Sequence, residues 1–480
     1  MRYSFSNAQM RKADANAIAA GVPAMELMER AGKGLADVVE RAMARLEADA
    51  LFVCGGGNNG GDGFVAARIL SGRGKDISVL CLADKFSAEC LKARDQFRGD
   101  IFERMPKRRY ALIVDCVFGT VLTRPPEGVA KDLIEFIANS GAYVISCDLP
   151  SGLSENGVAY EPCVVADETV VMGQVKNALL LADGADVAGQ ITVVDIGIPA
   201  IVGAEIWEDA DVAHIFPKRK SNVNKGTFGS VAILAGGPNG SGAAFLTAGA
   251  SLKSGAGYTK LYVSEQIYPH AIGKLPAVVL HELRGVDDEL LASQCIAIGM
   301  GMGVSEQLYG LIAELLQKYR GTLLLDADAL NTISRYGVGV LEGKQCEVIL
   351  TPHVKEFARL INRPVEDVLQ GAMELATEFA EKYGVIVVLK NNRTIITQGA
   401  RMAINTTGSA VLAKGGSGDV LAGFLAGTCA RGVPPFEASV VACYMLGRAG
   451  ELAENELGEY APDATDITEY LPKAILSVLK

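Results

Sequence analysis

The chain has 480 residues, of which 49% are hydrophobic and 21% are charged, a composition typical of a soluble globular protein with two or three domains. Its formal net charge of −11, without a Lys/Arg block, argues against a nucleic-acid surface. No apolar run reaches the ~18 residues that a membrane span needs, and residues 1–20 lack the apolar core of a signal peptide, so we expect no membrane partner.

The cysteines and histidines restrict the possibilities further. Ten cysteines are scattered without a C-x-x-C pair, and several lie in apolar runs. This usage is typical of buried free thiols in a reducing compartment and predicts a cytoplasmic protein. Only four histidines occur, without an H-E-x-x-H motif, which argues against a zinc hydrolase.

The first half of the chain alternates helical stretches with short apolar runs. Residues 6–46 show the spacing of an amphipathic helix, which we attribute to core packing. Candidate strands follow at residues 50–53, 77–82, 111–114, 143–147, 168–172 and 191–196. This alternation predicts a mostly parallel, doubly wound sheet, in which ligands bind beyond the carboxyl ends of the strands.

A glycine-rich run, Cys54–Gly63, joins the first of these strands to a helix. Gly55, Gly57 and Gly60 satisfy the dinucleotide fingerprint G-x-G-x-x-G, and a helix N-terminus suits an anion. The match is weak by itself, because two asparagines and Asp62 add side-chain oxygens where such a turn usually exposes bare backbone.

Two further strands end in an aspartate, Asp115 and Asp148, each followed by a glycine-containing loop. An isolated aspartate after a strand is most often a helix cap or a turn former. Three such loops at one edge of a sheet favour a binding site instead. Asn59, Asp115 and Ser151 offer hard oxygen donors for a cation, and Asp148 has the chemistry of a general acid or base.

These loops resemble the epimerase domain of NAD(P)H-hydrate repair enzymes. The resemblance is carried by residues 54–63, 115–125 and 148–153, and also by residues 27–32, 176–180 and 194–199. Val121 departs from the family, which usually has a second glycine there. The resemblance implies that Asp148 is catalytic and that K⁺ is bound by Asn59, Asp115 and Ser151. It implies substrate contacts by Asn58, Asn59, Gly60, Gly61, Asp62, Gly119, Thr120, Val121, Leu122, Thr123, Arg124, Pro125 and Asp148.

A polar, charged stretch at residues 207–222, interrupted by Pro217, separates the two halves. We place the domain boundary between residues 214 and 215. The second half restarts with a strand at 229–234, a glycine-rich loop and a long helix. Further strands, most followed by polar or glycine-bearing loops, are predicted at residues 296–298, 322–325, 348–350 and 385–389. These loops indicate a second cleft at the edge of a sheet.

The most informative stretch of the second half is Ala413–Gly423, where glycines open a helix with Asp419 in its first turn. The N-terminus of this helix suits a phosphate. A carboxylate beside a phosphate is useful if Asp419 takes a proton from a hydroxyl that attacks phosphorus. The alternative is an ordinary helix start capped by Asp419. The chain has no G-x-x-x-x-G-K-[ST] motif, so it is not a P-loop protein.

Residues 215–480 resemble the ribokinase-like superfamily and, more narrowly, NAD(P)H-hydrate dehydratases. The resemblance is carried by residues 224–229, 325–331, 351–356 and 415–421, with Ser417 in place of the commoner threonine. It implies substrate contacts by Ala243, Gly303, His353 and Asp419, with Asp419 as the catalytic base. A purely structural role stays open for His353. The resemblance also implies an adenine nucleotide held by Lys390, Asn391, Asn392, Arg393, Thr394 and Gly418.

Together the two resemblances predict an α/β protein, with a Rossmann-like doubly wound domain (1–214) followed by a ribokinase-like α/β domain (215–480). They imply a repair enzyme that epimerises R- and S-NAD(P)HX, the hydrated forms of NADH and NADPH, and dehydrates the S form with ADP, accompanied by Mg²⁺. NADHX, NADPHX and ADP are the expected partners, and we expect a homo-oligomer. Two alternatives stay open: a hydroxyl kinase of the ribokinase-like superfamily with a non-catalytic nucleotide-binding first domain, and a non-catalytic protein that senses the cofactor.

Overall fold

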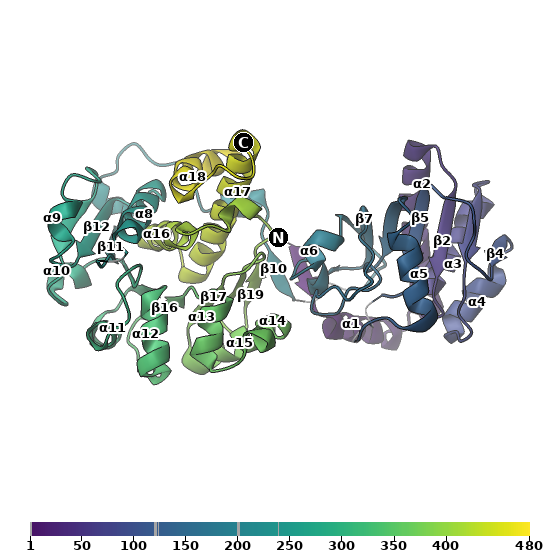
Figure 1. Ribbon diagram of the computed structural model, residues 1–480, viewed down its shortest axis with the longest axis horizontal. Helices are drawn as coiled ribbons and strands as arrows, with labels where there is room; N and C mark the ends of the chain where they lie inside the picture. Colours follow the sequence, from purple (N-terminus) through teal and green to yellow (C-terminus); the bar gives the residue numbers. More distant parts are fainter. Residues whose placement is uncertain (1, 120–121, 123, 199–201, 239) are drawn as a thin grey trace. The chain divides into compact units, whose positions relative to one another are not determined.

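The computed structural model describes residues 2–119, 122, 124–198, 202–238 and 240–480 (Figure 1). The chain forms two compact units, Tyr3–Ala204 and Glu205–Lys480, the second including Arg2. The N-terminal unit thus ends at Ala204, before the predicted domain boundary between residues 214 and 215. The strand just before the polar stretch pairs within the C-terminal sheet, and Trp207 and Val212 of the stretch are buried in the C-terminal core.

The N-terminal unit contains a seven-stranded parallel sheet in the order β4-β3-β2-β5-β6-β7-β9. Its strands are β2 (Ala50–Cys54), β3 (Ile77–Leu80), β4 (Asp100–Phe102), β5 (Leu112–Cys116), β6 (Tyr143–Cys147), β7 (Glu168–Met172) and β9 (Gln190–Val194). Its helices are α1 (Asn7–Ala19), α2 (Ala24–Leu46), α3 (Asn58–Gly72), α4 (Ala88–Gln96), α5 (Gly128–Ala138) and α6 (Gly184–Val187). β1 (Arg2–Phe5) pairs in parallel with β8 (Val175–Lys176).

Both faces of this sheet are covered, as the apolar strands predict. On one face Phe52 of β2 packs in a cluster with Leu35 of α2 and Phe64 of α3. On the other face Ile113 of β5 packs with Ile134 of α5. Since β2, β5 and β6 are neighbours, the three loops that follow them emerge side by side at the carboxyl edge.

The C-terminal unit has a longer sheet in the order β13-β12-β11-β14-β15-β16-β17-β18-β19-β10. The pairings are parallel from β13 to β17, and β18 pairs antiparallel with both β17 and β19. The strands are β10 (Ala204–Ile206), β11 (Ser230–Leu234), β12 (Tyr258–Val263), β13 (Val279–Glu282), β14 (Cys295–Ile298), β15 (Thr322–Leu325), β16 (Glu347–Leu350), β17 (Ile386–Leu389), β18 (Ile395–Thr397) and β19 (Met402–Ile404).

The helices of this unit lie in two groups (Figure 1). One group comprises α8 (Ser241–Lys253), α16 (Ser417–Ala430), α17 (Pro435–Leu457) and α18 (Ala464–Val478). The other comprises α11 (Glu306–Lys318), α12 (Asp328–Tyr336), α13 (Val354–Ile361), α14 (Val365–Gln370) and α15 (Ala372–Tyr383). The remaining helices are the short α7 (Asp209–Ala213), α9 (Tyr268–Ala271) and α10 (Asp288–Leu291).

Helices α8 and α16 approach each other unusually closely. A Cβ atom at Gly423 of α16 would lie 2.0 Å from the backbone oxygen of Thr247 of α8. Only glycine permits this approach, because any side chain would overlap the neighbouring backbone. The small residues of the sequence at this point therefore set the spacing of two core helices.

All ten cysteines are free, and all except Cys163 are buried, as predicted from their apolar surroundings. Over the part of the chain that the structure describes, no helix combines the length and the apolar character needed to cross a lipid bilayer.

Candidate active sites

The first candidate site lies where β2, β5 and β6 end. The turn after β2 is tight, since a Cβ atom at Gly60 would lie 1.9 Å from the backbone oxygen of Gly55. Asn59, in the first turn of α3, lies against the loop after β5. Its Oδ1 atom would be 3.3 Å from a Cβ atom at Gly119, and its buried Nδ2 atom has no hydrogen-bond partner among the described residues.

Asp115, near the end of β5, is completely buried and is held by hydrogen bonds to both carboxylate oxygens. Ser151 donates from Oγ (2.6 Å) and from its backbone N (2.8 Å), Ser146 Oγ donates at 2.9 Å, and Val117 N at 3.2 Å. Ser151 Oγ also accepts a hydrogen bond of 2.9 Å from Phe118 N. Burial raises the pKa of Asp115, and the hydrogen bonds from Ser151 oppose this rise.

The predicted cation ligands are thereby brought to one loop corner. Asp115 accepts a hydrogen bond from Ser151, and Ser151 accepts one from Phe118 N. Gly119, which follows Phe118 in the chain, lies against Asn59. Among the residues with described positions, Asp115 has no Lys or Arg partner, so its charge is met by neutral donors alone. A buried, oxygen-rich, uncompensated carboxylate is an environment that fits a hard monovalent cation.

Asp148, directly after β6, adopts a left-handed conformation with a φ of 69°. Such a conformation costs a non-glycine residue about 1–3 kcal/mol and is typical of functional positions. The Asp148 carboxylate accepts hydrogen bonds from Lys176 Nζ and, at 3.2 Å, from Met172 N. Asp148 N donates to Val170 O at 2.8 Å, which fixes the backbone. Asp148 is therefore firmly oriented at the carboxyl edge of the sheet.

Asp62, on α3, shares this electrostatic environment. Burial raises the pKa of Asp62 well above its ordinary value, and the nearby Asp148 carboxylate raises it further. Burial also raises the pKa of Asp14 on α1, whereas Lys176 lowers it. Three carboxyl groups thus influence one another around one buried ammonium group, and they cannot all be ionised at low cost.

The other predicted contacts of the first site differ in their placement. Asn58 is exposed and its Oδ1 accepts a hydrogen bond of 2.7 Å from Ser87 Oγ, the N-cap of α4. Gly60 and Gly61 are buried in α3. Leu122 is buried, and Arg124 and Pro125 are exposed. Thr120, Val121 and Thr123 lie outside the described residues.

The second candidate site is centred on Lys390, directly after β17. Lys390 Nζ donates to Oδ1 of the buried Asp326 at 2.8 Å, and Lys390 N donates to Pro352 O at 2.8 Å. A Cβ atom at Gly418 would lie 3.4 Å from Lys390 Nζ, and His353 forms a parallel bridge with Lys390. The ends of β15, β16 and β17 and the start of α16 therefore meet at this lysine.

Asp419, in the first turn of α16, faces this cluster. Burial raises its pKa from the ordinary value of 3.8 to about 6, Asp326 and Asp328 raise it as well, and Lys390 lowers it. At neutral pH such a carboxyl group is mostly ionised yet is a much better base than an ordinary aspartate. Within the described chain, its side chain forms no hydrogen bond or ion pair.

His353 is the N-cap of α13, which is the structural role that the sequence left open. Its Nδ1 accepts a hydrogen bond of 3.2 Å from Glu356 N, and Glu356 Oε2 accepts one of 2.9 Å from His353 N. The imidazole is nevertheless 47% exposed. Burial, Lys390 and Arg359 lower the pKa of His353, so the ring is neutral at neutral pH. A capping histidine can therefore still present Nε2 to a ligand.

The remaining predicted residues of this site lie in the loops around it. Gly303 N donates to Asp328 Oδ2 at 2.7 Å. Ala243 lies on α8, partly buried against the core. Asn391 and Asn392 are exposed in the turn between β17 and β18, where Thr394 is buried and Arg393 donates to Thr406 O. Sequence reasoning assigned no role to Asp326 or Lys176, although each is a charged residue within or at the end of an apolar run.

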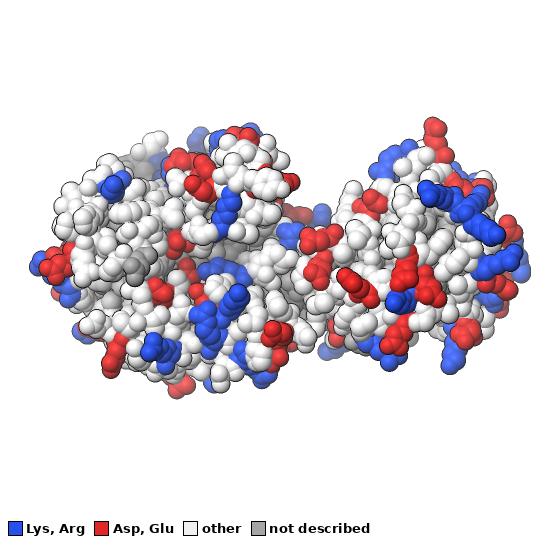
Figure 2. Space-filling model, viewed as in Figure 1, with Lys and Arg blue, Asp and Glu red and all other residues white. Residues whose placement is uncertain are grey.

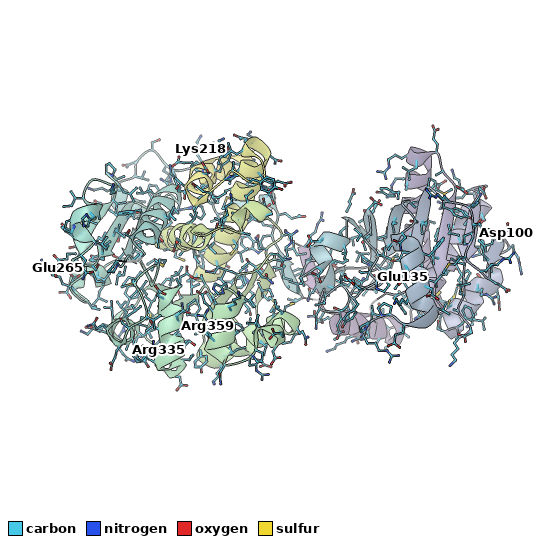
Figure 3. The ribbon with its side chains drawn as sticks, viewed as in Figure 1. Asp100, Glu135, Lys218, Glu265, Arg335 and Arg359 are labelled. Carbon is cyan, nitrogen blue, oxygen red and sulfur yellow. The ribbon has the colours of Figure 1, made fainter. Side chains whose placement is uncertain are left out.

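The surface of the C-terminal unit is recessed on the face shown in Figure 2, with acidic and basic side chains on the walls of the recess. Arg359 of α13, one of the cations that act on His353, lies beside this recess (Figure 3). Over the described residues, no group of three or more His, Cys, Asp or Glu side chains is close enough to hold a metal by itself.

Two largely parallel sheets, each with an aspartate of raised pKa at its carboxyl edge, Asp115 in the first and Asp419 in the second, define a two-domain α/β enzyme. Comparison with known families identifies it further. Residues 231–473 match the family model of NAD(P)H-hydrate dehydratases, and residues 24–178 match that of the YjeF-related protein N-terminus. The chain is 32% identical over 486 residues to the bifunctional NAD(P)H-hydrate repair enzyme Nnr of Thermofilum pendens, a match that covers 95% of this chain and 92% of that protein.

Solved structures agree for the second unit. The ADP/ATP-dependent NAD(P)H-hydrate dehydratase of Bacillus subtilis, co-crystallised with ATP and Mg²⁺, matches with a TM-score of 0.53 and 29% identity, over 57% of this chain and 99% of that one. A ribokinase-like superfamily protein of Enterococcus faecalis matches with a TM-score of 0.51 and 25% identity, over 58% and 98%.

The chain belongs to the family of bifunctional NAD(P)H-hydrate repair enzymes. The predicted family, enzyme class and α/β fold class, with a Rossmann-like domain followed by a ribokinase-like domain, are thereby confirmed. The comparisons favour the repair function over the alternative of a hydroxyl kinase with a non-catalytic first domain.

Proposed function

We propose that the N-terminal domain interconverts the R and S epimers of NADHX and NADPHX and that the C-terminal domain dehydrates the S epimer with ADP. The predicted domains are residues 1–214 and 215–480. One observation carries the proposal: in a chain similar to repair enzymes over 95% of its length, both sheets present an aspartate suited to proton transfer, Asp148 and Asp419.

The epimerase step requires a proton at the C6 hydroxyl of the hydrated ring. Protonation lets the hydroxyl leave as water while the lone pair of the ring nitrogen forms a double bond to C6. Water then returns on either face and gives up a proton. Asp148, oriented by its backbone and its two hydrogen-bond donors, would act in this proton transfer at the C6 hydroxyl. Residues 58–62 and 119–125 would hold the substrate around it.

K⁺ would bind at Asn59, Asp115 and Ser151. The support is the buried Asp115, which the described residues leave without a compensating cation. When bound, the ion supplies positive charge that offsets the carboxylate and a substrate phosphate. Asp115 and Ser151 order the two loops through their mutual hydrogen bond, and Asn59 of α3 lies against Gly119.

The dehydratase step requires a better leaving group than hydroxide. Asp419 would take the proton of the C6 hydroxyl as its oxygen attacks the terminal phosphorus of ADP, releasing AMP. The phosphate ester then loses phosphate from C6 and a proton from C5, which restores NADH or NADPH. The hydroxyl oxygen thus leaves on phosphate, and the reaction is irreversible.

Residues 390–394 and Gly418 would hold the adenine nucleotide, and Ala243, Gly303, His353 and Asp419 the substrate. The neutral His353 would donate or accept a hydrogen bond without adding charge. Mg²⁺ would enter with the nucleotide. The mutual influence of Asp326, Asp328 and Asp419 supports this fit, because one lysine does not neutralise three carboxylates. A cytoplasmic location agrees with ten free thiols, and a homo-oligomer stays a prediction.

The test is to supply an equal mixture of the R and S hydrates with ADP and Mg²⁺ and to follow the products by chromatography from the earliest times. The intact chain converts both epimers to NADH with AMP and phosphate. Asp148→Asn converts only the S epimer at early times, and Asp419→Asn converts neither. A phosphorylated hydrate as the end product would indicate a plain kinase, and an Asp148→Asn variant with wild-type early rates would overturn the epimerase assignment.

A further inference from the structure

We propose that Lys176 and Asp62 complete the proton-transfer machinery of the epimerase. Lys176 is a positioning residue that pairs with the Asp148 carboxylate and fixes its orientation, and Asp62 is the carboxylic acid that protonates the departing hydroxyl. The inference rests on the proposed epimerase function of Asp148 and deepens it.

The case for Lys176 is its burial. The side chain is 2% exposed, and its ammonium group donates to Asp148 Oδ1 and, at 2.7 Å, to Met172 O. Both ends of this pair are fixed by the backbone. Lys176 lies in β8, in register with Phe5 of β1, and Asp148 is held in its left-handed conformation by Val170. A buried ion pair gives little stability over well-packed apolar residues, so its presence beside the candidate base points to a chemical role.

The case for Asp62 is that, unlike Asp148, it has no cationic partner among the described residues. No hydrogen bond or ion pair to the Asp62 side chain occurs among the described residues, and the ammonium group of Lys176 is committed to Asp148. Two carboxyl groups that share one committed cation take different protonation states, since the paired one keeps the charge and the unpaired one keeps a proton.

The groups around Asp62 favour the same assignment. Burial raises the pKa of Asp62, Asp148 and Asp14 raise it further, and Lys176 lowers it only in part. Two thiols also act in this cluster. Burial raises the pKa of Cys90 to about 12. The pKa of Cys147 is raised to about 11, because burial and the carboxyl groups of Asp62, Asp148 and Asp115 together outweigh the hydrogen bond with Cys116, which lowers it. Both thiols therefore stay neutral and leave the proton with Asp62.

The proton inventory balances over one turnover. Asp62 gives its proton to the C6 hydroxyl, the C6–O bond breaks, water leaves, and the ring nitrogen supplies the electrons of the new C=N bond. A water molecule adds to the opposite face of C6, and the Asp148 carboxylate takes its proton. The enzyme then has an ionised Asp62 and a protonated Asp148. This is the starting state for the opposite epimer, as microscopic reversibility requires.

The experiment measures the pH dependence of kcat/KM for R-to-S conversion in the full-length chain, for wild type, Asp62→Asn, Lys176→Met and Lys176→Arg. Wild-type activity falls at high pH as Asp62 loses its proton. Asp62→Asn reduces kcat/KM by about 10²–10⁴-fold and removes the fall at high pH. Lys176→Met removes the partner that fixes the Asp148 carboxylate and reduces kcat/KM by about 10²-fold, and Lys176→Arg restores most of the loss. Lys33→Met, which breaks the exposed Lys33–Asp37 pair on α2, is the control and leaves the profile unchanged.

Dehydration of the S epimer by the same chain and the thermal melting of each variant report on folding. If Lys176→Met does not fold, the isosteric Asp62→Asn and the Lys176→Arg profile carry the test. The inference is overturned if either Asp62→Asn or Lys176→Met keeps kcat/KM for epimerisation within about twofold of wild type. Its failure is distinct from failure of the proposed function, which would require an active Asp148→Asn variant.

Discussion

Replacement of Asp419 by asparagine separates the contribution of this residue to catalysis from its effect on the free energy of unfolding. Folding raises the pKa of Asp419 from its ordinary value of 3.8 to about 6. A difference of about two pH units corresponds to about 3 kcal/mol, at about 1.4 kcal/mol each. The ionised carboxylate thus destabilises the C-terminal unit by up to about 3 kcal/mol near neutral pH.

The sign follows from proton linkage. A carboxyl group whose pKa is higher in the folded state binds more protons there, so stability falls as pH rises from 3.8 towards about 6 and then stays constant. The asparagine side chain carries no charge at any pH. We therefore expect Asp419→Asn to raise the free energy of unfolding by about 1–3 kcal/mol near neutral pH, a gain that shrinks as the pH falls below about 6.

The assay is calorimetric melting of the intact chain at several pH values, beside dehydratase kinetics. Asp419→Asn should lose about 10²–10⁴ in kcat while the transition of the C-terminal unit moves to higher temperature. The exposed Asp367→Asn on α14 is the matched control, with a change within about 0.5 kcal/mol. An inactive Asp419→Asn that melts at or below the wild-type temperature would refute the argument that burial and neighbouring carboxylates raise the pKa of this base.

Three further predictions concern packing and binding. Asp115→Ala leaves the donors of Ser151 and Ser146 buried without an acceptor; the N-terminal unit should lose about 2–4 kcal/mol in denaturant titrations, and K⁺ should no longer stimulate epimerisation. Gly423→Ala places a methyl group 2.0 Å from a backbone oxygen and should destabilise the C-terminal unit by about 1–3 kcal/mol. The control Gly310→Ala, in open space on α11, should stabilise the unit by up to about 1 kcal/mol. Equal effects of the two substitutions on the free energy of unfolding would contradict the close helix contact. The KM of the dehydratase for the S hydrate should stay constant from neutral to alkaline pH, because burial, Lys390 and Arg359 keep His353 neutral; a KM that rises through this range would show that the imidazole binds as a cation.

Much of the fold followed from the sequence because parallel strands covered on both faces are continuous apolar runs. The rule that ligands bind at carboxyl edges then brought Asp115 and Asp148 together without any contact being known. The antiparallel β18 and β19 and the short β10 were not predicted. They are three residues long, too short for a period to be recognised.

The electrostatics could not be predicted in the same way. That Lys176 is buried against Asp148, and that Asp62 has no cation of its own among the described residues, depends on contacts between segments far apart in the sequence. The hydrogen bond that Asn58 accepts from Ser87 is likewise a tertiary contact. A motif specifies which groups gather at an edge, whereas the path of the chain decides which of them hold protons.

The contact between Gly423 and Thr247 has a consequence for catalytic precision. The candidate base Asp419 lies one helical turn before Gly423, and the candidate substrate contact Ala243 lies one turn before Thr247, whose hydroxyl donates to Ala243 O at 2.8 Å. The two helices touch backbone to backbone, so the separation of base and substrate is set by a contact with no flexible side chain in it. A displacement of about 1 Å at such a site can cost about 10²-fold in rate. A single added methyl group, far from any reacting atom, would thus slow the enzyme by widening the gap across which the proton must pass.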